Sequence, residues 1–259
     1  MYTLIKPGRI IFAFAMIALA FLSFSSEDFI FGRPPAWSVG FSLNPTLAYV
    51  SGTIMIIASL AILFSFKGFA ASWLISALIF FLSCTRHFFH WMQDWLNMYK
   101  SLALVGGALI VAASFLNPTI NDHQTWIKVI SKFGSLLIAI FFISSGSAHF
   151  KYADFVDTLI PDYIPFHPFW TRFCGICLIA GGLGLLIPAT KKWAAMLSAI
   201  MIGGWFLLLH IPRLIHTPEN PGERLGVCES FCFVGIMMVL AGLSGSRIKQ
   251  KKGLHGLFI

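Results

Sequence analysis

The chain has 259 residues, of which 58% are hydrophobic and 11% are charged, and its formal net charge is +8 at pH 7. A water-soluble domain of this size cannot cover its surface with so little charge, so the composition excludes a soluble fold and indicates a lipid bilayer as the main partner. The excess of basic residues indicates anchoring against anionic lipid, and we predict no nucleic-acid partner.

Apolar runs divide the chain into membrane-spanning segments. Roughly 20 helical residues cross about 30 Å of hydrocarbon. Each run must be helical, because lipid offers no partner for an unpaired backbone amide. We predict an all-α membrane protein with eight transmembrane helices, at residues 9–25, 45–66, 69–90, 95–116, 131–149, 169–188, 192–211 and 224–244.

Basic residues are unevenly divided between the two faces that these spans define. With the N-terminus inside, the inner face holds 11 of the 18 basic residues and only one acidic residue, Asp122. An even number of spans returns the chain to the same side, and the excess of Lys and Arg marks that side as cytoplasmic. We therefore predict a multi-pass protein of the bacterial inner (cytoplasmic) membrane with both termini in the cytoplasm.

Landmarks recur in the same order in the two halves of the chain, which indicates a duplicated unit. An even number of spans in each half predicts two parallel four-helix repeats with a pseudo-two-fold axis along the membrane normal. We predict a first repeat at 1–116, a cytoplasmic linker at 117–130, and a second repeat at 131–259 with a basic C-terminal tail. The matched landmarks are Gly8 with Gly134, Pro35 with Pro161, Trp37 with Tyr163, Gly52 with Gly175, and Lys100 with Glu229.

Ionisable side chains gather near the outer ends of the spans, where their cost in a bilayer indicates a function. A buried acid beside an imidazole can relay protons or bind a carbonyl ligand, and an arginine can orient a carboxylate, sulfur oxyanion or quinone oxygen. The candidate catalytic residues are His149, His210, Arg213, Glu223 and Glu229; the candidate ligand-binding residues are Tyr163, His167, Trp170, Lys100, Arg86 and Asp94.

A structural clamp is the alternative interpretation of the same charges. In it Lys100 pairs with Glu229, or Arg213 pairs with Glu223, and nothing is bound. The long connections that end at Trp37 and Trp170 are rich in proline and aromatic residues, and we predict ordered loops over the outer mouth of each bundle.

The cysteines offer a different chemistry. Cys174 and Cys177 have the spacing of a redox pair, which makes a quinone-linked thiol-disulfide oxidoreductase an alternative function. Simple packing competes with it, because cysteine is a comfortable small residue inside a membrane helix. No histidine pair has metal-binding spacing on one helix face, so we predict no metal site, and haem between facing helices is the least favoured cofactor.

Several segments resemble the DoxX/DoxD-like membrane proteins. They are GSAHF ending at Phe150, IPDYIPFHPFW ending at Trp170, and AAMLSAIMIGGWFLLLHIPR ending at Arg213. The first half, with RPPAW and KSLALVGG, resembles a degraded copy, in which Arg86 replaces the counterpart of His210 and no Pro-Arg follows.

This resemblance implies a four-helix membrane unit and a redox role, because the named relatives include a subunit of thiosulfate:quinone oxidoreductase. It places the motif residues at His210, Arg213, Tyr163 and Trp170. The expected function is a quinone- or sulfur-compound-linked redox component, with a quinone as candidate cofactor and a soluble redox partner at the outer face. A non-enzymatic scaffold or binding protein is the remaining alternative.

Overall fold

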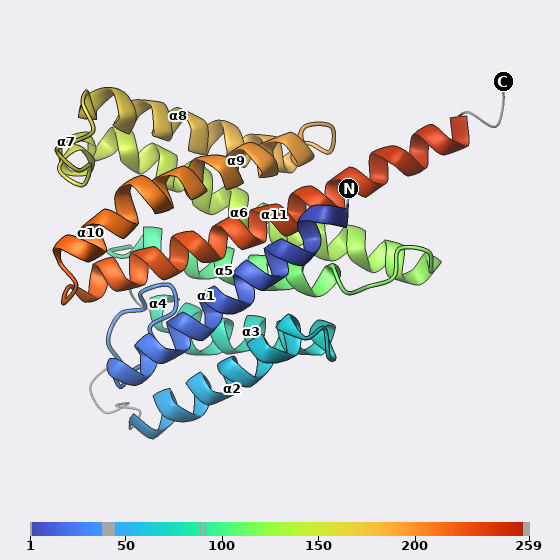
Figure 1. The fold of residues 1–259 in the computed structure, drawn as a ribbon, viewed down its shortest axis with the longest axis horizontal. Coiled ribbons are helices and arrows are strands. Elements are labelled where there is room, and N and C mark those ends of the chain that lie inside the picture. Colours follow the sequence, from blue (N-terminus) through green and yellow to red (C-terminus); the bar gives the residue numbers. More distant parts are fainter. Residues whose placement is uncertain (1, 38–44, 89, 91, 256–259) are drawn as a thin grey trace.

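The computed structural model describes residues 2–37, 45–88, 90 and 92–255 (Figure 1). Over these residues the chain is helical and contains no strand. Eight helical stretches are long and apolar enough to cross a membrane, which confirms the predicted all-α fold with eight such helices.

The elements follow one another in two similar series. After η1 (Tyr2–Leu4), the first series is α1 (Ile5–Ser25), α2 (Pro45–Leu63), α3 (Gly68–Ile79), η2 (Phe80–Cys84), α4 (Thr85–Phe88) and α5 (Trp95–Ala113). The second series is α6 (Asn121–Lys151), α7 (Ala153–Asp157), α8 (His167–Leu186), α9 (Lys191–Trp205), η3 (Phe206–His210), α10 (Ile211–His216) and α11 (Pro221–His255). In each series three elements share one span, namely α3, η2 and α4 in the first and α9, η3 and α10 in the second.

Helix α6 begins earlier than its apolar run suggested. Residues 121–130, which we predicted as linker, already belong to this helix. Ile127 and Ile130 are buried three residues apart on one helix face, and Asp122 lies in the first turn, where a negative charge favours the helix N-terminus. The polar residues of this segment occupy the opposite face, so its average hydropathy is low and hydropathy alone did not predict a helix here.

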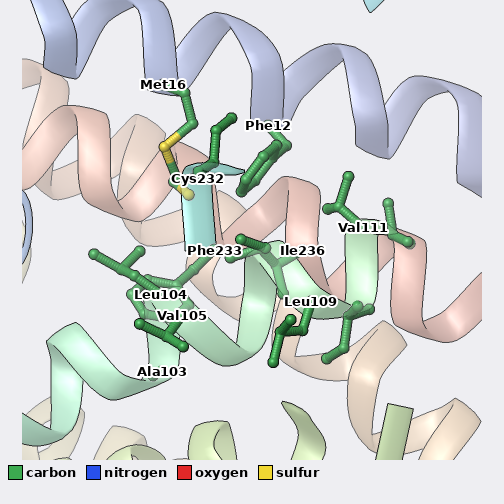
Figure 2. Packing of buried hydrophobic residues seen from close by; sticks show 14 of the residues in the cluster. Phe12, Met16, Ala103, Leu104, Val105, Leu109, Val111, Cys232, Phe233 and Ile236 are labelled. Atoms are coloured by element: carbon green, nitrogen blue, oxygen red, sulfur yellow. The ribbon is translucent and has the colours of Figure 1, made fainter. Parts of the chain in front are cut away.

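The spanning helices form a closed ring in which each packs against its neighbours. The order is α1, α2, α3, α5, α6, α8, α9 and α11, and α11 returns to α1. Helices α5 and α11 also touch across the middle of the ring, and they are the most deeply buried spans. The core lies where α1, α5 and α11 meet, and Figure 2 shows Phe12 and Met16 of α1 facing Cys232 and Ile236 of α11 beside Leu104 of α5.

Glycine pairs allow the closest helix contacts. A Cβ atom added to Gly106 in α5 would lie 2.8 Å from the carbonyl oxygen of Gly134 in α6. A Cβ atom added to Gly8 in α1 would lie 2.8 Å from the carbonyl oxygen of Gly235 in α11. Small residues at such crossings bring the two backbones together, so a methyl group at either site must force the helices apart.

We expect Gly106→Ala to lower the free energy of unfolding by about 1–3 kcal/mol, because the added methyl group overpacks the α5–α6 contact. Gly204→Ala is the matched control, because a Cβ atom there meets nothing within 4 Å. It should leave stability unchanged or raise it by up to about 1 kcal/mol through better helix propensity. Unfolding in detergent measures both, and equal losses would show that the glycine contact is not tight.

Candidate functional site

The regular α-helical geometry of the seventh span is interrupted near one end. The α-helical turn changes to a π-helix at Phe206–His210. Such turns are rare in proteins as a whole, and those that occur are often found at functional sites. Pro212 follows and has no backbone N–H, so the carbonyl of Leu208 loses its usual donor four residues later. The hydroxyl of Tyr163 donates to that carbonyl instead, which ties the aromatic loop before α8 to this helix.

A cavity of about 620 Å³ lies inside the second half of the chain near this break. Its walls come from α6, α7, α8, α9 to α10, and the start of α11. Such a volume, with mostly apolar walls and a few polar groups, is typical of small-molecule sites. Its polar lining residues include Arg33, His149, His210, Arg213, Asn220 and Glu223, and its aromatic ones are Tyr152, Phe155, Trp170 and Trp205.

Arg213 and Glu223 form an ion pair at the polar wall of the cavity. Nη2 of Arg213 bonds to Oε1 of Glu223, and Nη1 donates to the carbonyl of Leu159 at 2.9 Å. One of the clamps that we predicted is therefore formed, and it joins α10 to α11 and to the segment after α7. Glu223 is 8% exposed, and this burial strengthens the attraction between the two charges.

The two candidate histidines differ in their partners. Nδ1 of His149 lies 2.8 Å from the carbonyl oxygen of Ser145; a carbonyl only accepts, so Nδ1 carries the proton there and Nε2 is left to accept. His210 forms no hydrogen bond through its ring with any described residue, although it lines the cavity. Gly226 lies against this ring, with the site of its missing Cβ 3.2 Å from Nδ1. Both rings line the cavity, but only His210 has both ring nitrogens without a partner among the described residues, so it can donate to a bound molecule or accept from it.

The predicted pair between Lys100 and Glu229 is also formed. Nζ of Lys100 lies 2.8 Å from Oε2 of Glu229, and the backbone N–H of Gly32 donates to Oε1 at 3.1 Å. Neither Lys100 nor Glu229 lines the cavity. The pair joins the central helices α5 and α11 and anchors the loop after α1.

Arg33, which was not among the predicted site residues, connects this pair with the cavity. Nε of Arg33 lies 3.7 Å from Oε2 of Glu229, and its Nη2 donates to the carbonyl of Gly222 at 2.8 Å. With Arg33 and Arg213 against Glu223, the cavity lining carries one surplus positive charge when its histidines are neutral. Its position as the charged residue of the proline-rich RPPAW segment is the sequence feature that could have identified Arg33 as a site residue.

Two further candidates are placed in the first half, away from the cavity lining. Arg86 is 5% exposed and donates to Asp28 at 2.6 and 3.0 Å, to the carbonyl of Phe29 at 3.0 Å and to the carbonyl of Pro35 at 2.7 Å. Asp94 accepts from Asn97 at 2.7 Å, and its Oδ2 lies 3.1 Å from Nδ1 of His87. Both side chains therefore make structural contacts within the first half and do not contact the cavity.

The aromatic candidates line two neighbouring hollows. Tyr163 and Trp170 share a shallow surface hollow with the rest of the loop before α8. Trp170 also lines the deep cavity, where its ring meets Trp205 edge-on with 5.8 Å between ring centroids. His167, at the start of α8, lines neither hollow.

The two cysteines of the CxxC motif differ in their contact with the same cavity. Cys174 is buried, lines the cavity and accepts a hydrogen bond from Nε1 of Trp205 at 2.9 Å. Cys177 is half-buried and is not part of the lining. Both thiols are free. Among the described residues, no group of three histidine, cysteine or acidic side chains is placed to hold a metal ion.

Residues 138–227 match a family model described as a domain of unknown function (DUF8561). The match covers less than half of the chain, but it includes every cavity-lining residue except Arg33 and Leu96. No curated protein and no solved structure matches the chain. The chain is thus a multi-pass membrane-type helical protein whose family likeness coincides with the cavity.

Proposed function

We propose that this protein is a membrane redox component of the DoxX-like type that binds a quinone in the cavity of its second half, near the outer face of the membrane. The supporting observation is the His210 imidazole, which has no hydrogen-bond partner among the described residues and shares the cavity with Arg213. A quinone combines a flat apolar ring with carbonyl acceptors. Trp170 and Trp205 offer aromatic contacts to such a ring, and the polar wall offers donors to the carbonyls.

A quinone suits this cavity better than a small sulfur oxyanion. Most of the wall is apolar, so an oxyanion would lose its hydration without filling the space. Glu223 already balances the charge of Arg213. The surplus positive charge from Arg33 lies where a partly negative carbonyl oxygen, or a reduced quinone, would also be stabilised.

The proposal includes two parallel four-helix repeats around a pseudo-two-fold axis. Matched helices have matched neighbours: α1 packs on α11 as α6 packs on α5, and α5 meets α11 at the centre. The predicted match of Gly8 with Gly134 supports it, because Gly8 of α1 contacts Gly235 of α11 just as Gly134 of α6 contacts Gly106 of α5. Both series also place a π-helix in the third span, at Phe80–Cys84 and Phe206–His210.

We place the cavity end at the outer face. The N-terminus and the C-terminal end of α11 lie at the end of the bundle opposite α7 and α10 (Figure 1). The turn between α2 and α3, the connection between α5 and α6 and the turn between α8 and α9 lie at that same end (Figure 1), and these segments carry basic residues that we assigned to the cytoplasm by sequence, in line with the positive-inside rule. A soluble redox partner would then meet the protein on the side of α7 and α10.

We expect His210→Ala to weaken quinone binding about tenfold, the value of one hydrogen bond of about 1.4 kcal/mol, without unfolding the bundle. Decylubiquinone is a suitable probe, because Trp170 and Trp205 line the cavity and their fluorescence should be quenched on binding. His216→Ala is the matched control, since this histidine lies one turn and a half later, is exposed and lies outside the lining.

Equal affinity of His210→Ala and the native protein would contradict the proposal. Thiosulfate serves as the competing probe. If thiosulfate changes the tryptophan fluorescence of the native protein but not of His210→Ala, and the quinone changes neither, the ligand is a sulfur oxyanion and the quinone assignment is wrong.

A further inference from the structure

The loop that follows α1 enters the helix bundle instead of covering it. It turns back toward α4 and α5 (Figure 1). Phe29 and Phe31 are 1% and 0% exposed, and their rings stack with 4.5 Å between centroids. Both belong to the main hydrophobic core. Two aromatic rings from a connecting loop thus fill the interior of the first half near its polar end.

Donors on the surrounding helices satisfy the backbone carbonyls of this loop. Ser83 of η2 donates to the carbonyl of Phe31 at 2.6 Å, and Arg86 donates to the carbonyl of Phe29 at 3.0 Å. Ser101 of α5 donates to the carbonyl of Gly32 at 3.3 Å. Gly32 has a φ of +76°, and an added Cβ atom would collide with Ser101, so only glycine allows this close approach.

Corresponding positions of the second half surround the cavity. Ser83 and Leu209 are each the fourth residue of a π-helix; Ser83 touches Phe31, whereas Leu209 lines the cavity. The His149 position behaves in the same way. Its counterpart at the offset of the Gly8–Gly134 match is Ser23, whose hydroxyl accepts from the backbone N–H of Ile30 at 3.4 Å.

A contact between two side chains also recurs at the two sites. Arg213 and Glu223 form an ion pair that lines the cavity, and His87 and Asp94 lie 3.1 Å apart beside the buried loop. Counted from the π-helices, Arg213 corresponds to His87, so the structure does not align Arg86 with His210 as the sequence suggested. At the same offset, Phe29 corresponds to Phe155. Phe155 lines the cavity but is 65% exposed and belongs to the short helix α7, so its ring borders the cavity and does not fill it.

We propose that the first half holds a second copy of the ligand site, which the protein's own segment 28–33 occupies permanently. The phenyl rings take the place of a flat ring, and the peptide carbonyls take the place of its acceptors. The class of ligand rests on the function proposed above. The native protein then binds one ligand per chain, and removal of the two rings opens a second site for the same class of flat carbonyl compound.

The test is the binding stoichiometry of decylubiquinone in detergent. We expect one molecule per native chain and two per chain of Phe29→Ala/Phe31→Ala. A folded double variant that still binds one molecule overturns the proposal. If the double variant does not fold alone, decylubiquinone added during extraction should increase the yield of folded monomer, and no increase also overturns it.

A second variant separates this proposal from the function of the cavity. Ala148 lines the cavity, so Ala148→Phe should fill it and reduce binding to none. Combined with Phe29→Ala/Phe31→Ala, it should bind one molecule, at the first-half site. Binding by the combined variant but not by the native chain would remove the proposed function and keep the second site. If the native chain binds one molecule and the combined variant binds none, the proposed function stands and the second site is ruled out.

Discussion

Replacement of either partner of the Lys100–Glu229 pair is expected to lower the free energy of unfolding by about 3–5 kcal/mol. The two charges lie 2.8 Å apart on the central helices, and their side chains are only 12% and 6% exposed. Lys100→Met leaves a buried carboxylate with only the N–H of Gly32 and the more distant Arg33 as described partners. Glu229→Met leaves a buried ammonium and removes the acceptor of the Gly32 N–H. Because both positions are buried, water cannot solvate the charge that remains.

The double variant Lys100→Met/Glu229→Met should cost much less than the sum of the two single variants. Two methionines fill similar volume without a charge to desolvate, so the double-mutant cycle should show strong coupling. Glu219→Gln is the matched control. It breaks the Arg224–Glu219 pair, also 2.8 Å long, but Glu219 is 91% exposed, and a loss of less than about 1 kcal/mol is expected.

Unfolding of the detergent-solubilised protein by added denaturant gives all four values. Single variants within about 1 kcal/mol of the native protein would show that the pair is no clamp. Glu229 would then return as a candidate for proton transfer, the role that its sequence position first indicated.

Replacement of Arg86 by methionine is expected to cost a similar amount, about 3–5 kcal/mol. The guanidinium contacts both oxygens of Asp28 and two backbone carbonyls, and it lies 4.6 Å above the ring of Trp37. Its loss leaves the carboxylate unpaired and the buried carbonyl of Phe29 without this donor. Arg86→Lys should recover only part of the loss, because an ammonium cannot reproduce the planar fork.

Arg172→Met is the control for this series, since Arg172 is exposed and its one polar contact with a described residue is 3.5 Å long, to the carbonyl of Pro168. Thermal unfolding and decylubiquinone affinity should be measured together. We expect folded Arg86 variants to bind the quinone normally, because Arg86 does not line the cavity. Normal stability with lost binding would instead support the ligand-binding role that we predicted for Arg86.

Much of the candidate site could be anticipated from particular residues. Opposite charges at matched repeat positions identified Lys100 and Glu229 as a possible pair, and the structure forms it. The HIPR motif identified His210 and Arg213, and both line the cavity. His167 and Arg86 looked equally suitable, but proximity to the polar end of the bundle does not say which way a side chain turns.

The loops were the least predictable part. Both connections after the first helix of a series are rich in proline and aromatic residues, and we expected both to cover the outer mouth. One instead buries Phe29 and Phe31, and the other leaves Phe155 exposed. The difference depends on whether helix donors such as Ser83 meet the loop carbonyls, and that requires the packed helices.

The amino-acid sequence by itself determined that this chain forms eight helices long and apolar enough to cross a membrane, with its acidic residues concentrated toward one end. Long apolar runs have no other stable conformation in hydrocarbon, where every backbone amide must find a partner within its own segment. Only the tertiary structure decided which polar groups satisfy one another and which are left open to a ligand. The partners come from distant segments, as when Gly32 donates to Glu229 across 197 residues, and hydropathy carries no information about such pairs.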